Sequence, residues 1–315
     1  VINKAFVPEL PGEWAGGLIQ VNTKDIPTKN FFNIQIGSGF NNQAVQGNFY
    51  EHKGGKTDYL GIDDGTRSLP ATYTTKYAFD ALANADKTYI GSTMQNNWSP
   101  ILASGLTRLN GLFQMSAGFT KDLKGTKKIA GIFAMNYNKS ARHMIGTNSG
   151  FNFVGDGSYT TDFDFNDNRY SNDLLWGGLG NVTFQLNNNN KISAKTLFNI
   201  NATDFTSLRT GIEGNGNQFF DSTRGYEYGF KQNTFWNSQI TGEHNVKPNV
   251  LKLKWYGSFT ILDSYTPDQR RLYYLKNNSA VTNPYIAQLS NVLSQKSGKR
   301  LYQNLNDYIY IGGAD

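Results

Sequence analysis

Residues 251–261 read Leu-Lys-Leu-Lys-Trp-Tyr-Gly-Ser-Phe-Thr-Ile, and this stretch decides the fold class because its side chains alternate between two kinds. The two phases are Leu251, Leu253, Trp255, Phe259 and Ile261 on one side and Lys252, Lys254, Tyr256, Ser258 and Thr260 on the other. Successive side chains of a β-strand point to opposite faces. The period of two therefore predicts a strand with one apolar face and one polar face.

The same alternation recurs along the chain. The further runs are 31–40, 109–119, 129–137, 174–186, 192–202 and 228–244, and an eighth begins at Tyr308. Most of these runs have about the 9–11 residues with which a tilted strand crosses a bilayer. Strands of ordinary soluble proteins average about 5–6 residues. We therefore predict about eight long antiparallel strands, all-β, from a transmembrane β-barrel.

The expected connections between these strands alternate in length. Short polar turns are expected at 124–127, 187–190 and 247–249, and long connections at 52–107, 139–172, 204–227 and 263–306. Short periplasmic turns and long extracellular loops are typical of bacterial outer-membrane barrels. An odd number of crossings must precede the strand at 109–119, so we interpret 31–51 as one long, bulged strand. A short helix is expected near 76–86.

The composition agrees with a barrel wall that has one face toward water and one face toward lipid. Aromatic residues make up 14% of the chain and charged residues only 17%, whereas soluble domains carry about 25% charge. No apolar run reaches the roughly 18 residues of a membrane helix, which excludes a helical membrane protein. The absence of cysteine excludes disulfides and thiolate zinc sites. The net charge of +6 is scattered, so no nucleic-acid partner is expected.

The phases of the runs predict which side chains meet lipid. The lipid-facing set is Phe32, Ile34, Ile36, Phe113, Met115, Phe133, Trp176, Phe184, Leu253, Trp255 and Phe259. The set expected to face the lumen is Lys195, Asn199, Lys252 and Lys254. Lipid-facing and lumen-facing residues alternate along the strands of a membrane barrel.

A motif precedes the first strand. Residues 8–24 read Pro-Glu-Leu-Pro-Gly-Glu-Trp-Ala-Gly-Gly-Leu-Ile-Gln-Val-Asn-Thr-Lys. This segment resembles the end of the plug in TonB-dependent outer-membrane receptors, where an Ala-Gly-Gly and a strand ending in Thr-Lys precede the barrel. The sequence segments 54–67, 96–100 and 175–179 are similar to segments of receptors of the Bacteroidetes type. The glycines would let the backbone pass close to the barrel wall.

The resemblance implies a domain division and a larger assembly. Residues 1–30 would be the end of the plug and its connector, and 31–315 the first part of an incomplete barrel of about 22 strands. The expected plug–barrel junction is Trp14, Ala15, Gly16, Gly17, Thr23 and Lys24. Val1 starts an ordinary polar stretch with no signal peptide, so we expect an N-terminal segment, with the TonB box, to lie outside this sequence.

The expected function is TonB-dependent import of a nutrient ligand across the bacterial outer membrane. Its implied partners are TonB, membrane lipid and lipopolysaccharide, the unidentified ligand and, in some such receptors, a surface lipoprotein lid. The alternative is a structural barrel subunit of a secretion or surface-attachment assembly. No nucleophile–base constellation is visible, so we expect neither an enzyme nor a cofactor.

Two small sets of residues are candidate binding sites. Aromatic residues of the expected outer loops could stack on a sugar or peptide ligand: Phe219, Phe220, Tyr226, Tyr273 and Tyr274. Packing within the loops or an interfacial girdle is the plainer interpretation of each. Asp162, Asp164 and Asp167 form an acidic run that superficially suggests calcium, but it lacks the Gly and Glu of an EF-hand loop. A solvated acidic loop is the plainer interpretation. The three histidines, His52, His143 and His244, are too far apart in the sequence to suggest a metal site.

Overall fold

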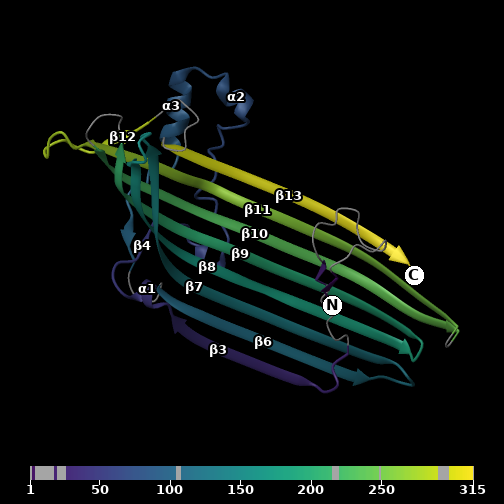
Figure 1. The fold of residues 1–315 in the computed structure, drawn as a ribbon. Helices are drawn as coiled ribbons and strands as arrows, with labels where there is room; N and C mark the ends of the chain where they lie inside the picture. Colours follow the sequence, from purple (N-terminus) through teal and green to yellow (C-terminus); the bar gives the residue numbers. More distant parts are fainter. Residues whose placement is uncertain are drawn as a thin grey trace.

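One large antiparallel sheet dominates the computed structural model of the chain (Figure 1). The structure describes residues 2–3, 18–19, 26–103, 108–214, 220–247, 250–289 and 298–314. The long strands are β3 (Phe31–Phe40), β6 (Leu109–Asp122), β7 (Lys128–Phe153), β8 (Tyr159–Asn187), β9 (Asn190–Gly214), β10 (Phe220–Lys247), β11 (Leu251–Asn277) and β13 (Lys299–Ala314). Each pairs with its sequence neighbour, and the short β12 (Ile286–Gln288) pairs with β11 beside β13. The eight predicted strands are confirmed.

The sheet is open over the described residues. β3 forms one edge and pairs with β6, while β12 and β13 lie at the other edge beside β11. The remaining strands are two short pairs, β1 (Ile2–Asn3) with β2 (Leu18–Ile19) and β4 (Tyr50–Glu51) with β5 (Ile101–Leu102). None of the described helices is long and apolar enough to cross a membrane.

Strands β7 to β11 are much longer than the sequence alternation indicated. Each has 25 to 29 residues, so the segments 139–172 and 204–227 are mainly strand, and 263–306 is strand at both ends. The expected long loops there are wrong. The short turns are confirmed: the hairpin of β6 and β7 closes with a hydrogen bond from Leu123 N to Lys127 O, and Gly125 takes the positive φ that the turn requires (74°).

The first strand also differs from the prediction. β3 ends at Phe40 and does not continue to residue 51, because Asn41 caps a short helix, α1 (Asn42–Val45), by accepting a hydrogen bond from Gln43 N. The chain then runs through β4, the 3-10 turn η1 (Asp58–Leu60), α2 (Lys76–Asp80) and α3 (Asn84–Thr93) before β5. We call residues 41–103 the crossing loop. The prediction of a single long strand before 109–119 is confirmed, since β3 pairs antiparallel with β6.

The strand register assigns side chains to two faces, because directly paired residues of antiparallel strands point the same way. One ladder joins Ile36, Phe113, Tyr137, Trp176 and Ile200. All eleven residues of the predicted lipid-facing set lie on this face, which we call the apolar face. The four residues expected in the lumen lie on the opposite face, which we call the polar face.

A β-bulge changes the phase of one strand. Between Thr266 and Gln269 the pairing of β11 with β13 shifts, and Asp268 there adopts a positive φ of 48°. The pairing of β11 with β10 shifts at the same level. Even-numbered residues of β11 before the bulge, such as Lys254, share the polar face with odd-numbered residues after it, such as Tyr273. Bulges insert one extra residue in this way.

Candidate functional site

The crossing loop packs on the apolar face, over the middle parts of β7 to β10. Side chains of three strands hold its backbone: Tyr137 Oη donates to Tyr59 O (2.9 Å), Trp176 Nε1 to Leu60 O (2.6 Å) and Tyr228 Oη to Trp98 O (2.9 Å). Two small cores lie beneath it, one formed by Ala44, Phe49, Ala103, Ala141 and Tyr170 and the other by Leu174, Ile200, Ala202 and Phe230. This part of the apolar face is therefore covered by protein.

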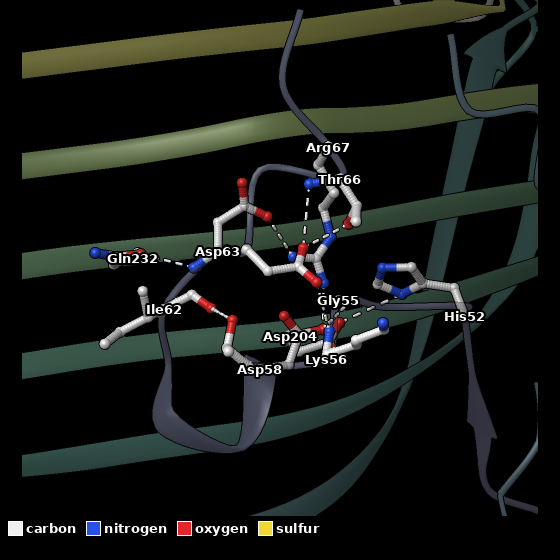
Figure 2. A network of polar contacts seen from close by, with 12 residues as sticks. His52, Gly55, Lys56, Asp58, Ile62, Asp63, Thr66, Arg67, Asp204 and Gln232 are labelled. Atoms are coloured by element: carbon white, nitrogen blue, oxygen red, sulfur yellow. Dashed lines mark hydrogen bonds and ion pairs between the residues drawn. The ribbon is translucent and has the colours of Figure 1, made fainter.

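A buried arginine fixes the loop from within. Arg67 is 3% exposed and donates to carboxylates of its own segment, to Asp58 and to Asp63 Oδ1 (2.7 Å). Its guanidinium lies 4.5 Å from the centre of the Phe230 ring on β10. Figure 2 shows Arg67, Asp58 and Asp63 beside the strands of the sheet, with Gln232 accepting a hydrogen bond from Asp63 N (3.1 Å). Each ion has a partner, which a buried charge requires.

His52 and Asp204 form a second contact between loop and sheet. His52 Nδ1 lies 3.3 Å from Asp204 Oδ1. Burial, with the nearby Arg67, lowers the pKa of His52 to about 3. Burial raises the pKa of Asp204 to about 7. The pair therefore holds one proton at mildly acidic pH, on the carboxyl group. This contact, like that of Arg67, stabilises the loop on the sheet.

A pocket of about 560 Å³ lies on the polar face of β8 to β11. Two ladders of paired residues form its floor: Asp167, Arg209, Gly225 and Tyr273 in one, and Arg169, Ser207, Glu227 and Arg271 in the next. Gly225 leaves space for the Tyr273 ring, since a Cβ atom built on it would lie 3.0 Å from that ring. Pockets of this volume accommodate small organic ligands.

The pocket wall combines charged and aromatic side chains. Arg209 binds Asp167 with two hydrogen bonds of 2.6 Å and lies 4.6 Å from the centre of the Phe165 ring. Phe165 in turn stacks on Phe163, with ring centres 5.0 Å apart. Such a wall offers fixed charges beside flat apolar surfaces. It can bind a ligand that has both polar and apolar parts.

The predicted aromatic ligand residues lie near two pockets. Tyr226 and Tyr273 both border the polar-face pocket, and the Tyr226 ring also contacts the Tyr274 ring, 5.9 Å away, beside Trp98 on the apolar face. Their role in ligand binding stays a prediction. Phe219 and the side chain of Phe220 lie outside the described residues.

The acidic run does not form a metal site. It lies on β8, where Asp164 accepts a hydrogen bond from Ser149 Oγ (2.6 Å) on the apolar face and Asp167 binds Arg209 on the polar face. Asp162 borders the pocket. Over the described ranges, no three His, Cys, Asp or Glu side chains are arranged to hold a metal ion. Asp164 and Asp167 point to opposite faces of the same strand, so this arrangement gives the calcium candidate no support.

The three histidines make unrelated contacts. His143 Nε2 lies 2.9 Å from Asn168 Oδ1, and the His143 ring stacks on Tyr170. His244 Nδ1 lies 2.7 Å from Asn190 Oδ1.

The expected plug–barrel junction lies outside the described residues, so it stays a prediction. Its residues are Trp14, Ala15, Gly16, Gly17, Thr23 and Lys24.

Comparison of the chain with protein-family models, curated proteins and solved structures found no match.

Sequence reasoning missed the arginines of the pocket. Arg169, Arg209 and Arg271 fall in segments that were expected to be loops. A signal was present: from Phe163 to Arg169 every second residue is aromatic or charged, as in a strand with one functional face. The pairing of these segments across four strands depends on register, which this alternation does not specify.

Proposed function

We propose that the chain forms part of the wall of a bacterial outer-membrane β-barrel of the TonB-dependent receptor type, which imports a nutrient ligand. The observation that carries this proposal is the division of the sheet near its short turns into an apolar and a polar face. From β3 to β11 the large side chains of one face are mainly Phe, Ile, Met and Trp, and those of the other mainly Asn, Gln, Ser, Thr and Lys. A wall between lipid and a wet lumen needs this division.

The strand lengths support an orientation in which the strand ends far from the short turns lie outside the cell. A strand of 25 to 29 residues rises about 80–95 Å at roughly 3.3 Å per residue, while about 9–11 residues cross the bilayer. The strands would therefore extend far beyond the membrane on the side away from the short turns. The pocket and the crossing loop lie in that part, accessible to a ligand outside the cell.

The chain before β3 supports the polar face as the lumen. Thr120 lies on the polar face, and its Oγ1 donates a hydrogen bond to Pro27 O (2.8 Å). The segment that leads into β3 therefore starts on the polar side, where a plug would fill the barrel. In this orientation the crossing loop lies against the outer surface of the wall, above the lipid, and the pocket faces the interior.

The proposal is tested by energy-dependent uptake. The full-length protein is purified from its native membrane, a copurified ligand is identified by mass spectrometry, and uptake of that labelled ligand is measured in cells with and without TonB. Import should require both the protein and TonB. Uptake that persists without TonB, or a protein that copurifies with a secretion or attachment assembly and no ligand, would instead support the structural barrel subunit.

A further inference from the structure

We propose that the polar-face pocket binds its ligand through a carboxylate that Arg169 receives, while an apolar part of the ligand lies on the nearby aromatic rings. This inference deepens the proposed function, because it names the chemistry of the ligand at the same pocket. Its test measures binding and not import, so the two proposals fail separately.

The pairing of charges in the pocket points to Arg169. Arg209 donates two hydrogen bonds to the carboxylate oxygens of Asp167, and Arg271 Nη2 donates to Glu227 Oε2 (2.8 Å). The other oxygen of Glu227 accepts a hydrogen bond from Gln269 Nε2 (2.6 Å). Two of the three guanidinium groups thus have dedicated carboxylates within the wall.

The third guanidinium has none. Arg169 lies over Phe205, 3.7 Å from the ring centre. Glu227 and Asp173 are near enough to act on its charge, but among the described residues no carboxylate accepts a hydrogen bond from it. Partial burial lowers its pKa, but an arginine keeps its charge in proteins. The ring covers one face of the guanidinium and leaves its N–H edge for the pocket. A planar, half-buried fork of this kind suits an oxyanion that accepts two hydrogen bonds.

The position of Phe205 is itself fixed by the sheet. Gly229 on β10 lies under the ring, and a Cβ atom built there would come within 2.6 Å of it. The glycine therefore lets the ring lie flat across the neighbouring strand, and the ring holds the guanidinium. Arg169 is oriented before any ligand arrives, which reduces the entropy lost on binding.

The aromatic neighbours favour an organic anion over a bare inorganic one. Along the pocket Phe163 stacks on Phe165, Arg209 lies over Phe165, and the Tyr273 ring is 5.9 Å from the Arg209 guanidinium. This continuous aromatic and guanidinium surface gives an apolar group a place to pack. A ligand with a carboxylate and a flat apolar body would use both features of the wall.

The test uses three probes on the full-length protein in detergent, with calorimetry as the readout: phenylacetate, its neutral analogue phenylacetamide, and inorganic phosphate. Phenylacetate should bind, and phenylacetamide should bind roughly tenfold to a hundredfold more weakly, since a charged hydrogen-bonded pair is lost. Equal affinity for the acid and the amide, or no binding of the acid, would overturn the proposal. Phosphate that binds as tightly as phenylacetate would overturn the role of the aromatic wall.

Variants locate the effect. Arg169→Gln should lower the affinity for phenylacetate by a similar factor, and Arg169→Lys should restore it only in part, because lysine lacks the planar fork. The matched control is Arg224→Gln, an exposed arginine on the apolar face of β10 that lies over Tyr285. It should bind phenylacetate like the wild type. If Arg169→Gln unfolds at the wild-type temperature and still binds phenylacetate equally well, the assignment of Arg169 is wrong.

Discussion

Replacing Phe259 by lysine places a charge on the apolar face of β11. Phe259 is eight residues beyond Leu251, the start of the strand, so it lies about 27 Å along the strand, or about 19 Å above the turn at a tilt near 45°. The apolar band of an outer-membrane barrel is about 25 Å tall. The lysine would therefore lie within the lipid, between the midplane, where a charge costs about 2–4 kcal/mol, and the outer interface, where it costs about 0–1 kcal/mol.

The lost ring contacts must be separated from the cost of the charge. The Phe259 ring lies 4.9 Å from Tyr310 and 6.5 Å from Trp236, and each such pair contributes about 0.5–1.5 kcal/mol. Phe259→Ala removes these contacts without adding a charge. Phe259→Lys should therefore be less stable than Phe259→Ala by about 1–3 kcal/mol, the cost expected between the midplane and the interface.

The assay is urea-induced unfolding of the full-length protein in lipid vesicles. Ser258→Lys is the matched control, because it adds the same charge at the neighbouring position on the polar face. It should cost less than about 1 kcal/mol, as a change that faces water. Equal losses for Ser258→Lys and Phe259→Lys would refute the assignment of the two faces.

Two further predictions concern the crossing loop. Arg67→Met leaves the carboxylates of Asp58 and Asp63 buried without their cation, so attachment of the loop should weaken by about 3–5 kcal/mol. Amide hydrogen exchange of residues 48–100 measures this loss. Unchanged protection would contradict the anchoring role of Arg67. The second prediction concerns His52 and Asp204 between about pH 4.5 and 6. In this window the folded pair holds one proton, on Asp204, and the unfolded pair also holds one proton, on His52. The contribution of the pair to loop attachment should therefore not vary with pH in this window. In Asp204→Asn only the unfolded state gains a proton, so attachment should weaken as the pH falls below about 6.5. Limited proteolysis measures attachment, at pH 6 and pH 5 for the wild type and at pH 7 and pH 5 for the variant. An Asn variant with no pH dependence would show that the histidine does not titrate as inferred.

The sequence predicted the strands and their phase because large side chains alternate where one face is apolar. It underestimated the length of β7 to β11, since beyond the apolar band both faces carry polar residues, as at Asp164 and Asp167, and the contrast between them disappears. The bulge at Asp268 also escaped prediction. Its local signal is Pro267, since a proline within a strand is confined to edge strands, first residues and bulges. The bulge moves Tyr273 to the polar face.

The site was less accessible to sequence reasoning than the fold. The ladder from Arg169 to Arg271 joins residues about a hundred positions apart through the register of three hairpins. The attachment of the crossing loop depends likewise on distant contacts, such as His52 with Asp204. Each residue alone is typical of a solvated surface, and only their pairing gives them a common role.

The central claim, that the apolar face meets lipid and the polar face meets water, can be measured directly on β8. The chain contains no cysteine, so single cysteines at positions 181 to 185 can be labelled with an environment-sensitive fluorophore in the full-length protein in vesicles. Labels replacing Val182 and Phe184 should emit as in lipid, and labels replacing Asn181, Thr183 and Gln185 as in water. Emission without this alternation, or with the opposite phase, would contradict the account.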